Sequence, residues 1–284
     1  MMPLRICILW VFSTLFVLSI AHAQEKNYRF LHLDVNEGLS QGSVFAIEQD
    51  HLGFMWIGTR DGLNKYDARK FTIYRSNPQD SLSLEHNFIQ AITEDNRNRL
   101  WVGTTGGLNL YNRDADNFTR ILLPVVESSS GKIEVNVHQI FQDSNGVIWI
   151  ATNVGLYRIK EGDHLQAELV FNEITVEGSN GRSYFRNFRT IYEDRKKRLW
   201  FCTDDAIVVM QSAAQDGNRL KVLRTYFNQK GLINKVNQRF QAVLEFAPGI
   251  FWIGTKYNGI KIINENTGEV SSLTGDDSHT ANLV

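Results

Sequence analysis

Short apolar runs recur along the chain and are separated by turn residues. Runs such as Val44–Ile47 and Phe88–Ile92 open a unit, and runs such as Leu63–Tyr66 and Leu108–Tyr111 follow two turns later. Short strands at regular spacing, bounded by turns, indicate an all-β architecture. The chain after residue 23 shows no pattern typical of a long amphipathic helix.

A tryptophan phrase marks the repeat. Five of the six tryptophans begin it, at spacings of 45, 48, 51 and 52 residues. The copies are Trp56-Ile-Gly-Thr, Trp101-Val-Gly-Thr, Trp149-Ile-Ala-Thr, Trp200-Phe-Cys-Thr and Trp252-Ile-Gly-Thr. Four short strands within a period of about 45–50 residues are typical of a propeller blade. The pattern therefore predicts a β-propeller of four-stranded antiparallel blades.

The strand that carries the tryptophan is expected to be buried on both faces. Trp56 and Ile57 are both large and apolar, although neighbouring side chains on a strand point to opposite faces. The next position is always small: Gly58, Gly103, Ala151, Cys202 and Gly254. A small residue there is expected where the next blade approaches closely. We therefore interpret the five tryptophans as core residues.

An aspartate precedes the tryptophan by six residues in four copies: Asp50, Asp95, Asp143 and Asp194. Phe246 takes this place in the fifth copy. Because Gly, Asn or Lys follows three residues later, each aspartate is expected to open a hairpin turn and cap it, and not to form a ring of metal ligands. Six histidines after residue 23 show no metal-ligand spacing, so no cofactor or metal is predicted.

The register places five blades at approximately 43–76, 87–122, 136–172, 187–228 and 238–274. Residues 28–35 resemble the outer strand of a blade and are predicted to be an N-terminal closing strand. Residues 276–284 resemble the start of a next blade. We therefore interpret residues 24–284 as a partial propeller of five blades and the start of a sixth.

The first 23 residues differ from the repeats. Arg5 precedes an apolar run from Ile6 to Ile20, and Ala21-His22-Ala23 follows. This is typical of a secretory signal cleaved after Ala23, with an uncleaved anchor as the alternative. A formal net charge of −1 gives no reason to expect nucleic acid as a partner. The sequence thus predicts an exported, periplasmic domain.

One copy of the repeat carries a family resemblance. The pattern Glu94-Asp95-x4-Leu100-Trp101-Val102-Gly103-Thr104-x2-Gly107-Leu108-Asn109-x-Tyr111 resembles the two-component regulator propeller repeat, and the opening Asp34-x2-Glu37-Gly38-Leu39-Ser40-Gln41 is similar to the start of such arrays. The resemblance is weakest in the fourth copy, where Asp204-Asp205-Ala206 departs from the pattern.

This resemblance implies the periplasmic sensor region of a hybrid two-component histidine kinase, of the kind common in Bacteroidetes. It implies an oligosaccharide released from a glycan as ligand. It also implies further blades and signalling domains of the same receptor as partners, with a homodimer left open. Kinase activity and the phosphorelay would reside in domains that this sequence does not contain.

Candidate ligand contacts lie on one predicted face. The turn after each tryptophan strand and the links between blades meet there, and a constant scaffold with varied loop residues is a common way to build a binding surface. The candidates are Arg60, Asp61, His86, Asn87, Thr105, Asn153, Asp204, Asp205, Lys256 and Tyr257. No catalytic residue is predicted, because no nucleophile motif such as Gly-x-Ser-x-Gly occurs.

Two other functions remain open at this point. A carbohydrate-active lyase or hydrolase would need two converging acids or a histidine base on one face. A protein-interaction scaffold would need a flat apolar face instead.

Overall fold

The computed structural model describes residues 30–124, 133–162, 164–171, 173–175, 182–184, 187–204, 206–212, 220–226 and 239–273. Within these ranges every regular element is a strand, and no helix that could cross a membrane is present among them. All the sheets belong to the compact unit formed by residues 34–284. Residues 30–35, the described part of the closing strand predicted over 28–35, contain no strand. Residues 1–29 and 274–284, which include the predicted start of a next blade, lie outside the described ranges.

Five four-stranded sheets follow one another along the chain. The first contains β1 (Val44–Gln49), β2 (Met55–Thr59), β3 (Gly62–Tyr66) and β4 (Phe71–Tyr74). The second contains β5 (Ile89–Glu94), β6 (Leu100–Thr104), β7 (Leu108–Asn112) and β8 (Asn117–Ile121). The third contains β9 (Val137–Gln142), β10 (Ile148–Thr152), β11 (Leu156–Lys160) and β12 (Gln166–Phe171).

The fourth sheet contains β15 (Thr190–Glu193), β16 (Arg198–Cys202), β17 (Ile207–Ser212) and β18 (Leu220–Tyr226). The fifth contains β19 (Phe240–Ala247), β20 (Ile250–Thr255), β21 (Ile260–Asn264) and β22 (Glu269–Leu273). Each sheet is an antiparallel meander, which confirms the predicted four-stranded blades. A short hairpin of β13 (Glu173–Thr175) and β14 (Arg182–Tyr184), which the repeat pattern did not predict, lies between the third and fourth blades in the chain.

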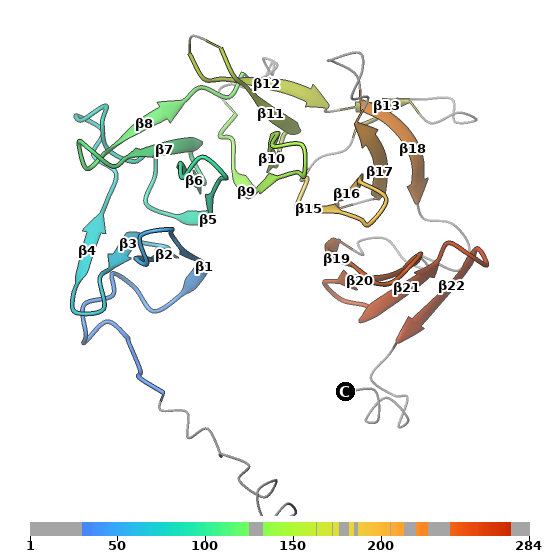
Figure 1. The fold of residues 1–284 in the computed structure, drawn as a ribbon, viewed down its shortest axis with the longest axis horizontal. Coiled ribbons are helices and arrows are strands. Elements are labelled where there is room, and N and C mark those ends of the chain that lie inside the picture. The colour runs from blue at the N-terminus through green and yellow to red at the C-terminus, as the bar shows by residue number, and fades with distance from the viewer. Residues whose placement is uncertain are drawn as a thin grey trace, which may run out of the picture. The chain divides into compact units, whose positions relative to one another are not determined.

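Neighbouring blades meet through their first strands. β1 contacts β5, β5 contacts β9, β9 contacts β15 and β15 contacts β19. Figure 1 shows these five strands innermost and the fourth strand of each blade outermost. The blades therefore follow one another in chain order around an axis, as in a propeller.

The small residue of the tryptophan strand allows this close approach. A Cβ atom added at Gly58 would lie 2.7 Å from Cγ2 of Ile89, and one added at Gly103 would lie 2.4 Å from Cγ1 of Val137. Ile89 and Val137 begin the inner strands of the next blades. The second and third blades thus each insert an apolar side chain into a space that only a glycine leaves open.

The hairpin-turn aspartates hold their own tryptophans. Oδ2 of Asp50 accepts a hydrogen bond of 2.8 Å from Nε1 of Trp56, while its Oδ1 accepts from the backbone N–H groups of Leu52 and Phe54. The same indole bond recurs in three more pairs: Asp95–Trp101, Asp143–Trp149 and Asp194–Trp200. In the fifth blade Phe246 instead stacks on Trp252, with ring centroids 4.7 Å apart.

One face of β1 is exposed, unlike its equivalents. Val44 and Ile47 are 41% and 59% exposed, whereas Ile89 and Ile92, at the same positions of the second blade, are 0% and 7% exposed. In the second to fifth blades these positions are covered by the preceding blade. The structure therefore shows an apolar inter-blade surface on β1 with no blade against it among the described residues.

Matched alanine substitutions test this assignment. Ile140 is buried at the position equivalent to Ile47, so Ile140→Ala should lower the free energy of unfolding by about 2–4 kcal/mol. Ile47→Ala should cost less than about 1 kcal/mol, because little apolar surface leaves a buried site. Urea denaturation of the two variants compares them directly, and equal losses would contradict the exposed face.

Removing a buried capping aspartate should destabilise the fold. Asp143→Ala leaves the indole of Trp149 and the amides of Asn145 and Val147 without their acceptor. We expect a loss of about 2–4 kcal/mol in thermal or urea unfolding. Asp114→Ala, which changes an exposed turn carboxylate, is the matched control and should change stability by less than about 0.5 kcal/mol.

Candidate ligand-binding face

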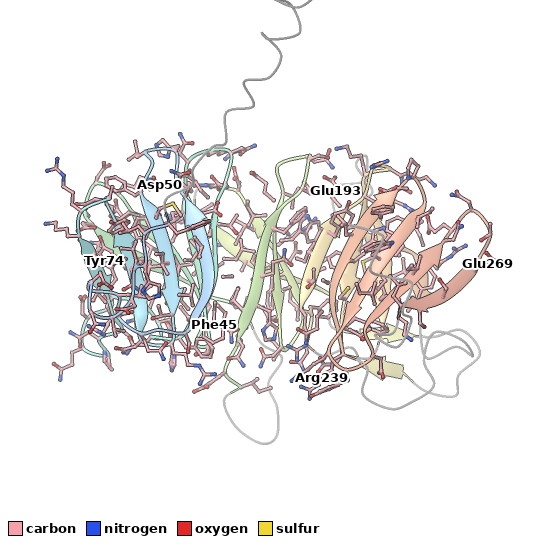
Figure 2. The ribbon with its side chains drawn as sticks, turned by 90° about the horizontal axis from the view of Figure 1, so that it is seen from below. Phe45, Asp50, Tyr74, Glu193, Arg239 and Glu269 are labelled. Atoms are coloured by element: carbon pink, nitrogen blue, oxygen red, sulfur yellow. The ribbon has the colours of Figure 1, made fainter. Side chains whose placement is uncertain are left out.

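The turns and links of the blades form two opposite faces. Figure 2 shows Asp50 and Glu193 on one side and Phe45 and Arg239 on the other. The first is called the hairpin-turn face here, because it carries the turns that the capping aspartates open. The second is called the link face and carries the turns after the tryptophan strands and the blade-to-blade links.

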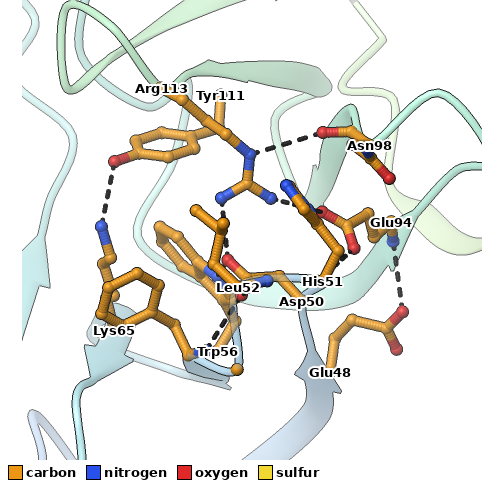
Figure 3. Close-up of polar contacts among 12 residues, drawn as sticks. Glu48, Asp50, His51, Leu52, Trp56, Lys65, Glu94, Asn98, Tyr111 and Arg113 are labelled. Atoms are coloured by element: carbon orange, nitrogen blue, oxygen red, sulfur yellow. Dashed lines mark hydrogen bonds and ion pairs between the residues drawn. The ribbon is translucent and has the colours of Figure 1, made fainter.

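Charged groups on the hairpin-turn face are used to join blades. Arg113 of the second blade donates from Nη1 to Oδ2 of Asp50 at 2.8 Å and from Nη2 to Glu94. Glu94 also accepts the backbone N–H of His51 at 2.7 Å (Figure 3). Burial alone would raise the pKa of Asp50, but hydrogen bonds from Trp56, Arg113 and the Phe54 amide outweigh it and hold the pKa below its ordinary value.

The bond from Glu94 to the preceding blade is a repeated feature. In each of the second to fifth blades, a Glu or Gln that precedes the capping position accepts the N–H of the turn residue one blade earlier. The pairs are Glu94 with His51, Gln142 with Asn96, Glu193 with Ser144 and Glu245 with Arg195. Gln49, the equivalent in the first blade, donates only to its own turn, at 3.5 Å from the carbonyl of Gly53. The hairpin-turn face is therefore largely occupied by structural contacts.

Several predicted ligand contacts on the link face serve the fold. Asp61 forms an ion pair of 2.9 Å with Arg75. Oδ1 of Asn87 accepts the N–H of Ser76 at 2.6 Å. Oδ1 of Asn153 accepts the N–H of Asn136, and its Nδ2 donates to the carbonyl of Glu134. These side chains fix the blade links and have little capacity left for a ligand.

His86 and Thr105 are brought together as a pair. Nδ1 of His86 lies 2.7 Å from Oγ1 of Thr105 and accepts the N–H of Phe88 at 3.0 Å. Nδ1 is therefore the acceptor for the backbone of Phe88, and the ring is exposed. Together with Glu85, Arg120 and Glu134, His86 lines the rim of a cavity of about 430 Å³ between the second and third blades.

This cavity has a mostly apolar floor and a constrained rim. Leu108, Ile121 and Val135 line it. Arg120 is held by the carbonyls of Asp80, Ser83 and Leu84, and its Nε lies 3.3 Å from Oε2 of Glu85. The guanidinium of Arg120 thus fixes the loop that contains Asp80, Ser83 and Leu84.

A second group surrounds Asp204, closer to the inner strands. Its carboxylate accepts Nδ2 of Asn187 at 2.7 Å and Nε of Arg189 at 2.6 Å. Nε of Arg239, from the link before β19, lies 3.9 Å away. Asp204 therefore lies close to two arginines, one before β15 of the fourth blade and one before β19 of the fifth. Asp205 lies outside the described residues.

The inner strands extend this group to the second and third blades. Nδ1 of His138 on β9 lies 3.2 Å from Oε1 of Gln90 on β5. Burial, and then the positive charge of Arg189, lower the pKa of His138 to about 4. The imidazole is therefore neutral near pH 7, and it connects Gln90 to the arginines around Asp204 without adding charge.

Arg60 lies at the first-blade end of the same face. Its guanidinium carbon is 5.5 Å from the ring centroid of Phe45 and 5.4 Å from that of Phe88, and the two rings contact each other edge to face. Lys256 lies over the ring of Tyr257 in the fifth blade, at 5.2 Å. Cations and aromatic rings thus occur together at both ends of the link face.

Several residues of this group were not among the predicted contacts. They occupy one position of the inner strand, five residues before the capping position: Phe45, Gln90, His138, Arg189 and Gln241. In the sequence, this position could have been recognised as the one that varies within an otherwise apolar run. We define the axial cluster as Arg60, Phe45, Phe88, Gln90, His138, Arg189, Asp204 and Arg239.

Comparison with known families identifies the repeat. The sequence profile described as "Two component regulator propeller" matches residues 38–61, 83–106 and 131–154, which cover the first two strands and adjoining links of the first three blades. These three segments are similar to two-component regulator propeller repeats. The match confirms the resemblance carried by the tryptophan phrase.

A curated relative shares part of the regulator propeller sequence. Over 62 residues the chain is 55% identical to histidine kinase P4 of Formosa agariphila. This segment is 22% of the chain and 4% of the kinase. The chain therefore corresponds to a small part of that relative's length.

Solved structures share the propeller fold. The extracellular domain of the hybrid two-component system BT3049 of B. thetaiotaomicron matches with a TM-score of 0.52 and 19% identity, over 87% of this chain and 37% of that one. PorZ of Porphyromonas gingivalis matches with a TM-score of 0.60 and 14% identity, over 83% and 34%. Virginiamycin B lyase of Staphylococcus aureus matches with a TM-score of 0.60 and 14% identity, over 89% and 76%. At these identities the likeness concerns the fold alone.

The depressed pKa of His138 predicts a pH dependence of stability. The unfolded chain takes up a proton on this ring near pH 6.5, whereas the folded chain does so only near pH 4. Stability should therefore fall as the pH drops from about 6.5 to about 4, by up to about 3 kcal/mol from this group. His138→Gln should remove this part of the pH dependence in urea denaturation, while substitution of the exposed His164 should leave it in place. Identical pH profiles for wild type and His138→Gln would contradict the assignment.

Proposed function

We propose that this regulator propeller is a ligand-sensing region of a two-component receptor and that it binds an oligosaccharide on its link face. The observation that carries the proposal is the axial cluster. Polar side chains of the second to fourth blades lie around His138 and Asp204, and Arg60 packs on Phe45 at the first blade. The opposite face is occupied by structural hydrogen bonds. Hydrogen-bonding groups beside aromatic rings suit a sugar, which has hydroxyl edges and apolar ring faces.

A ligand at this place has a direct route to signalling. The axial cluster draws side chains from inner strands of successive blades, and these strands are the contacts between blades. A ligand that touches several of them stabilises one relative arrangement of the blades. A receptor whose states differ in that arrangement is then shifted toward the one that binds better.

We also propose an exported, periplasmic location. The sequence of residues 1–23 supports it, and extracellular domains of two-component systems share the fold. Residues 1–23 lie outside the described residues, so cleavage after Ala23 remains a prediction. Mass spectrometry of the mature N-terminus would test it.

A further blade of the same receptor is the proposed partner of the β1 face. Val44 and Ile47 are exposed where their equivalents are covered, and Gln49 bonds within its own turn where its equivalents bind a preceding blade. A blade with the same repeat would cover both side chains and give Gln49 a backbone N–H. This proposal is separate from ligand binding and fits a propeller with more than five blades.

A lyase or hydrolase activity is the second candidate, because a lyase shares this fold. Incubation of the purified chain with the oligosaccharide that it binds, followed by chromatography of the products, separates the two functions. Unchanged ligand supports a sensor, and catalytic turnover supports the enzyme.

Isothermal titration calorimetry against an oligosaccharide panel tests the proposed site. Phe45→Ala should weaken binding about tenfold, which corresponds to about 1.4 kcal/mol for one lost aromatic contact. Phe246→Ala is the matched control, because Phe246 is also an exposed phenylalanine but contacts Trp252 in a hairpin turn. Equal affinities for wild type and Phe45→Ala would place the ligand elsewhere, and no binding across the panel would argue against the proposed function.

A further inference from the structure

One side of the fifth blade is exposed, and it is the side opposite to the one exposed in the first blade. The tryptophans of the first four blades are at most 1% exposed, because each packs against the next blade. Trp252 is only partly buried, and its cross-strand neighbour Leu244 is 53% exposed. We call this surface of the fifth blade the socket face, and its residues are Leu244, Trp252, Gly254 and Ile260.

Gly254 has free space above it. A Cβ atom added at Gly58 or Gly103 would overlap the next blade. Among the described residues, one added at Gly254 would meet only Ala242 of its own blade, at an ordinary contact distance of 3.4 Å. Gly254 therefore has the small size that a close approach requires, but no described blade approaches it.

The side chain that enters each socket depends on the residue at its base. A glycine is paired with a branched aliphatic side chain, whereas a larger residue is paired with a phenylalanine. The pairs are Gly58 with Ile89, Gly103 with Val137, Ala151 with Phe188 and Cys202 with Phe240.

The first blade carries the matching side chain. Val44 lies at the position equivalent to Ile89 and Val137, because each is paired with the threonine of its own tryptophan phrase. We call Val44, Ile47 and Ile57 the plug face. Val44 over Gly254 would reproduce the combination of valine and glycine that joins the second and third blades.

We infer that the socket face of one copy of this chain takes up the plug face of a second copy, with Val44 placed over Gly254. The inference goes beyond the proposed function, because it needs no ligand. Both halves of the contact are present on the chain, and both are exposed in the structure. A second copy supplies what each face lacks, as neighbouring blades do within the chain.

The contact is favourable because it buries apolar side chains. Val44 and Ile47 are 41% and 59% exposed on one face, and Leu244 is 53% exposed on the other. Removing such groups from water is the main driving force of most protein association. Shape complementarity adds to it, since the same kinds of side chain already fit together between the blades of the chain.

Backbone hydrogen bonds accompany the insertion in two of the internal interfaces. The N–H of Phe188 donates to the carbonyl of Thr152 at 2.8 Å, and the N–H of Phe240 donates to the carbonyl of Thr203 at 3.2 Å. Thr255 is the equivalent threonine of the fifth blade. An entering first blade would therefore find an equivalent acceptor at the socket face.

The contact joins two unlike faces, so the copies would associate head to tail. A dimer formed in this way keeps one free plug face and one free socket face. Further copies can therefore add as the concentration rises, unless the assembly closes into a ring.

Sedimentation velocity of the full chain at about 1 to about 100 μM tests the inference. We expect the average mass to rise with concentration. Val44→Asp places a charge on the plug face and Gly254→Val fills the socket, so each should weaken self-association about tenfold or more. Thermal unfolding checks that both variants are folded.

Val222→Asp is the matched control. Val222 lies on β18, the outermost strand of the fourth blade, and is 36% exposed, which is close to the value for Val44. This variant should associate like the wild type. Ile47→Asp and Leu244→Asp change more exposed positions of the plug and socket faces. They should repeat the effects of Val44→Asp and Gly254→Val, and they keep the test valid if either of those variants unfolds.

A mixture of the two interface variants tests the head-to-tail geometry. Val44→Asp keeps an intact socket face, and Gly254→Val keeps an intact plug face. Each variant alone should remain monomeric, whereas the mixture should form a dimer with one copy of each and nothing larger. A mixture without this dimer would overturn the inference.

Two other results would also overturn it. A wild-type chain that stays monomeric at every concentration would leave both faces to further blades of the same receptor. Self-association that Val44→Asp leaves unchanged, or that Val222→Asp weakens equally, would show that the copies meet elsewhere on the chain. These measurements contain no oligosaccharide, so their failure leaves the proposed function untouched.

Discussion

The structure depends on the close approach of each blade to the next. Ile89 enters the space above Gly58, and Val137 enters the space above Gly103, where even one added carbon would overlap the neighbour. This packing joins the sheets into an array and buries Trp56, Trp101, Trp149 and Trp200. It also sets the size of the residue after the Trp-x pair in the first two blades, where that residue is Gly58 or Gly103.

The hairpin-turn face and the link face differ in how their side chains are used. On the hairpin-turn face, the capping aspartates hold their tryptophans, and Glu or Gln side chains reach back to the preceding blade. On the link face, Asn87 and Asn153 secure the links, whereas among the described residues the side chain of Arg189 bonds only Asp204 and Arg60 packs on aromatic rings. The link face, where fewer side chains take part in structural hydrogen bonds, is therefore the face that can accept a ligand.

Much of the fold could be predicted because its signals repeat in the chain. The Trp-x-small-Thr phrase revealed the blades, and the six-residue offset to Asp50 and its equivalents revealed the hairpin turns. The bonds between blades were missed, since Glu94 and His51 lie 43 residues apart and nothing local connects them. The β13–β14 hairpin was missed because it occurs once and breaks the repeat.

The candidate site was harder to predict for a related reason. Turn residues such as Asp61 and Asn153 looked available because they are polar and varied, yet local partners use them. Phe45 lies inside β1 and Arg189 directly precedes β15, and only the arrangement of the inner strands around an axis brings these side chains close to the turns. Whether a polar side chain is available to a ligand depends on its neighbours in three dimensions. The spacing of residues in the sequence does not reveal these neighbours.

The blade-to-blade contacts also make this part of the chain a linear array with nearest-neighbour coupling. Opening the third blade breaks its contacts with both the second and the fourth, whereas opening the first breaks contacts with the second alone within the described structure. In such an array the free energy of local opening rises from the end toward the middle. The exposed side of β1 therefore marks the place where fraying begins, and whatever covers it would extend the cooperative unit by one interface.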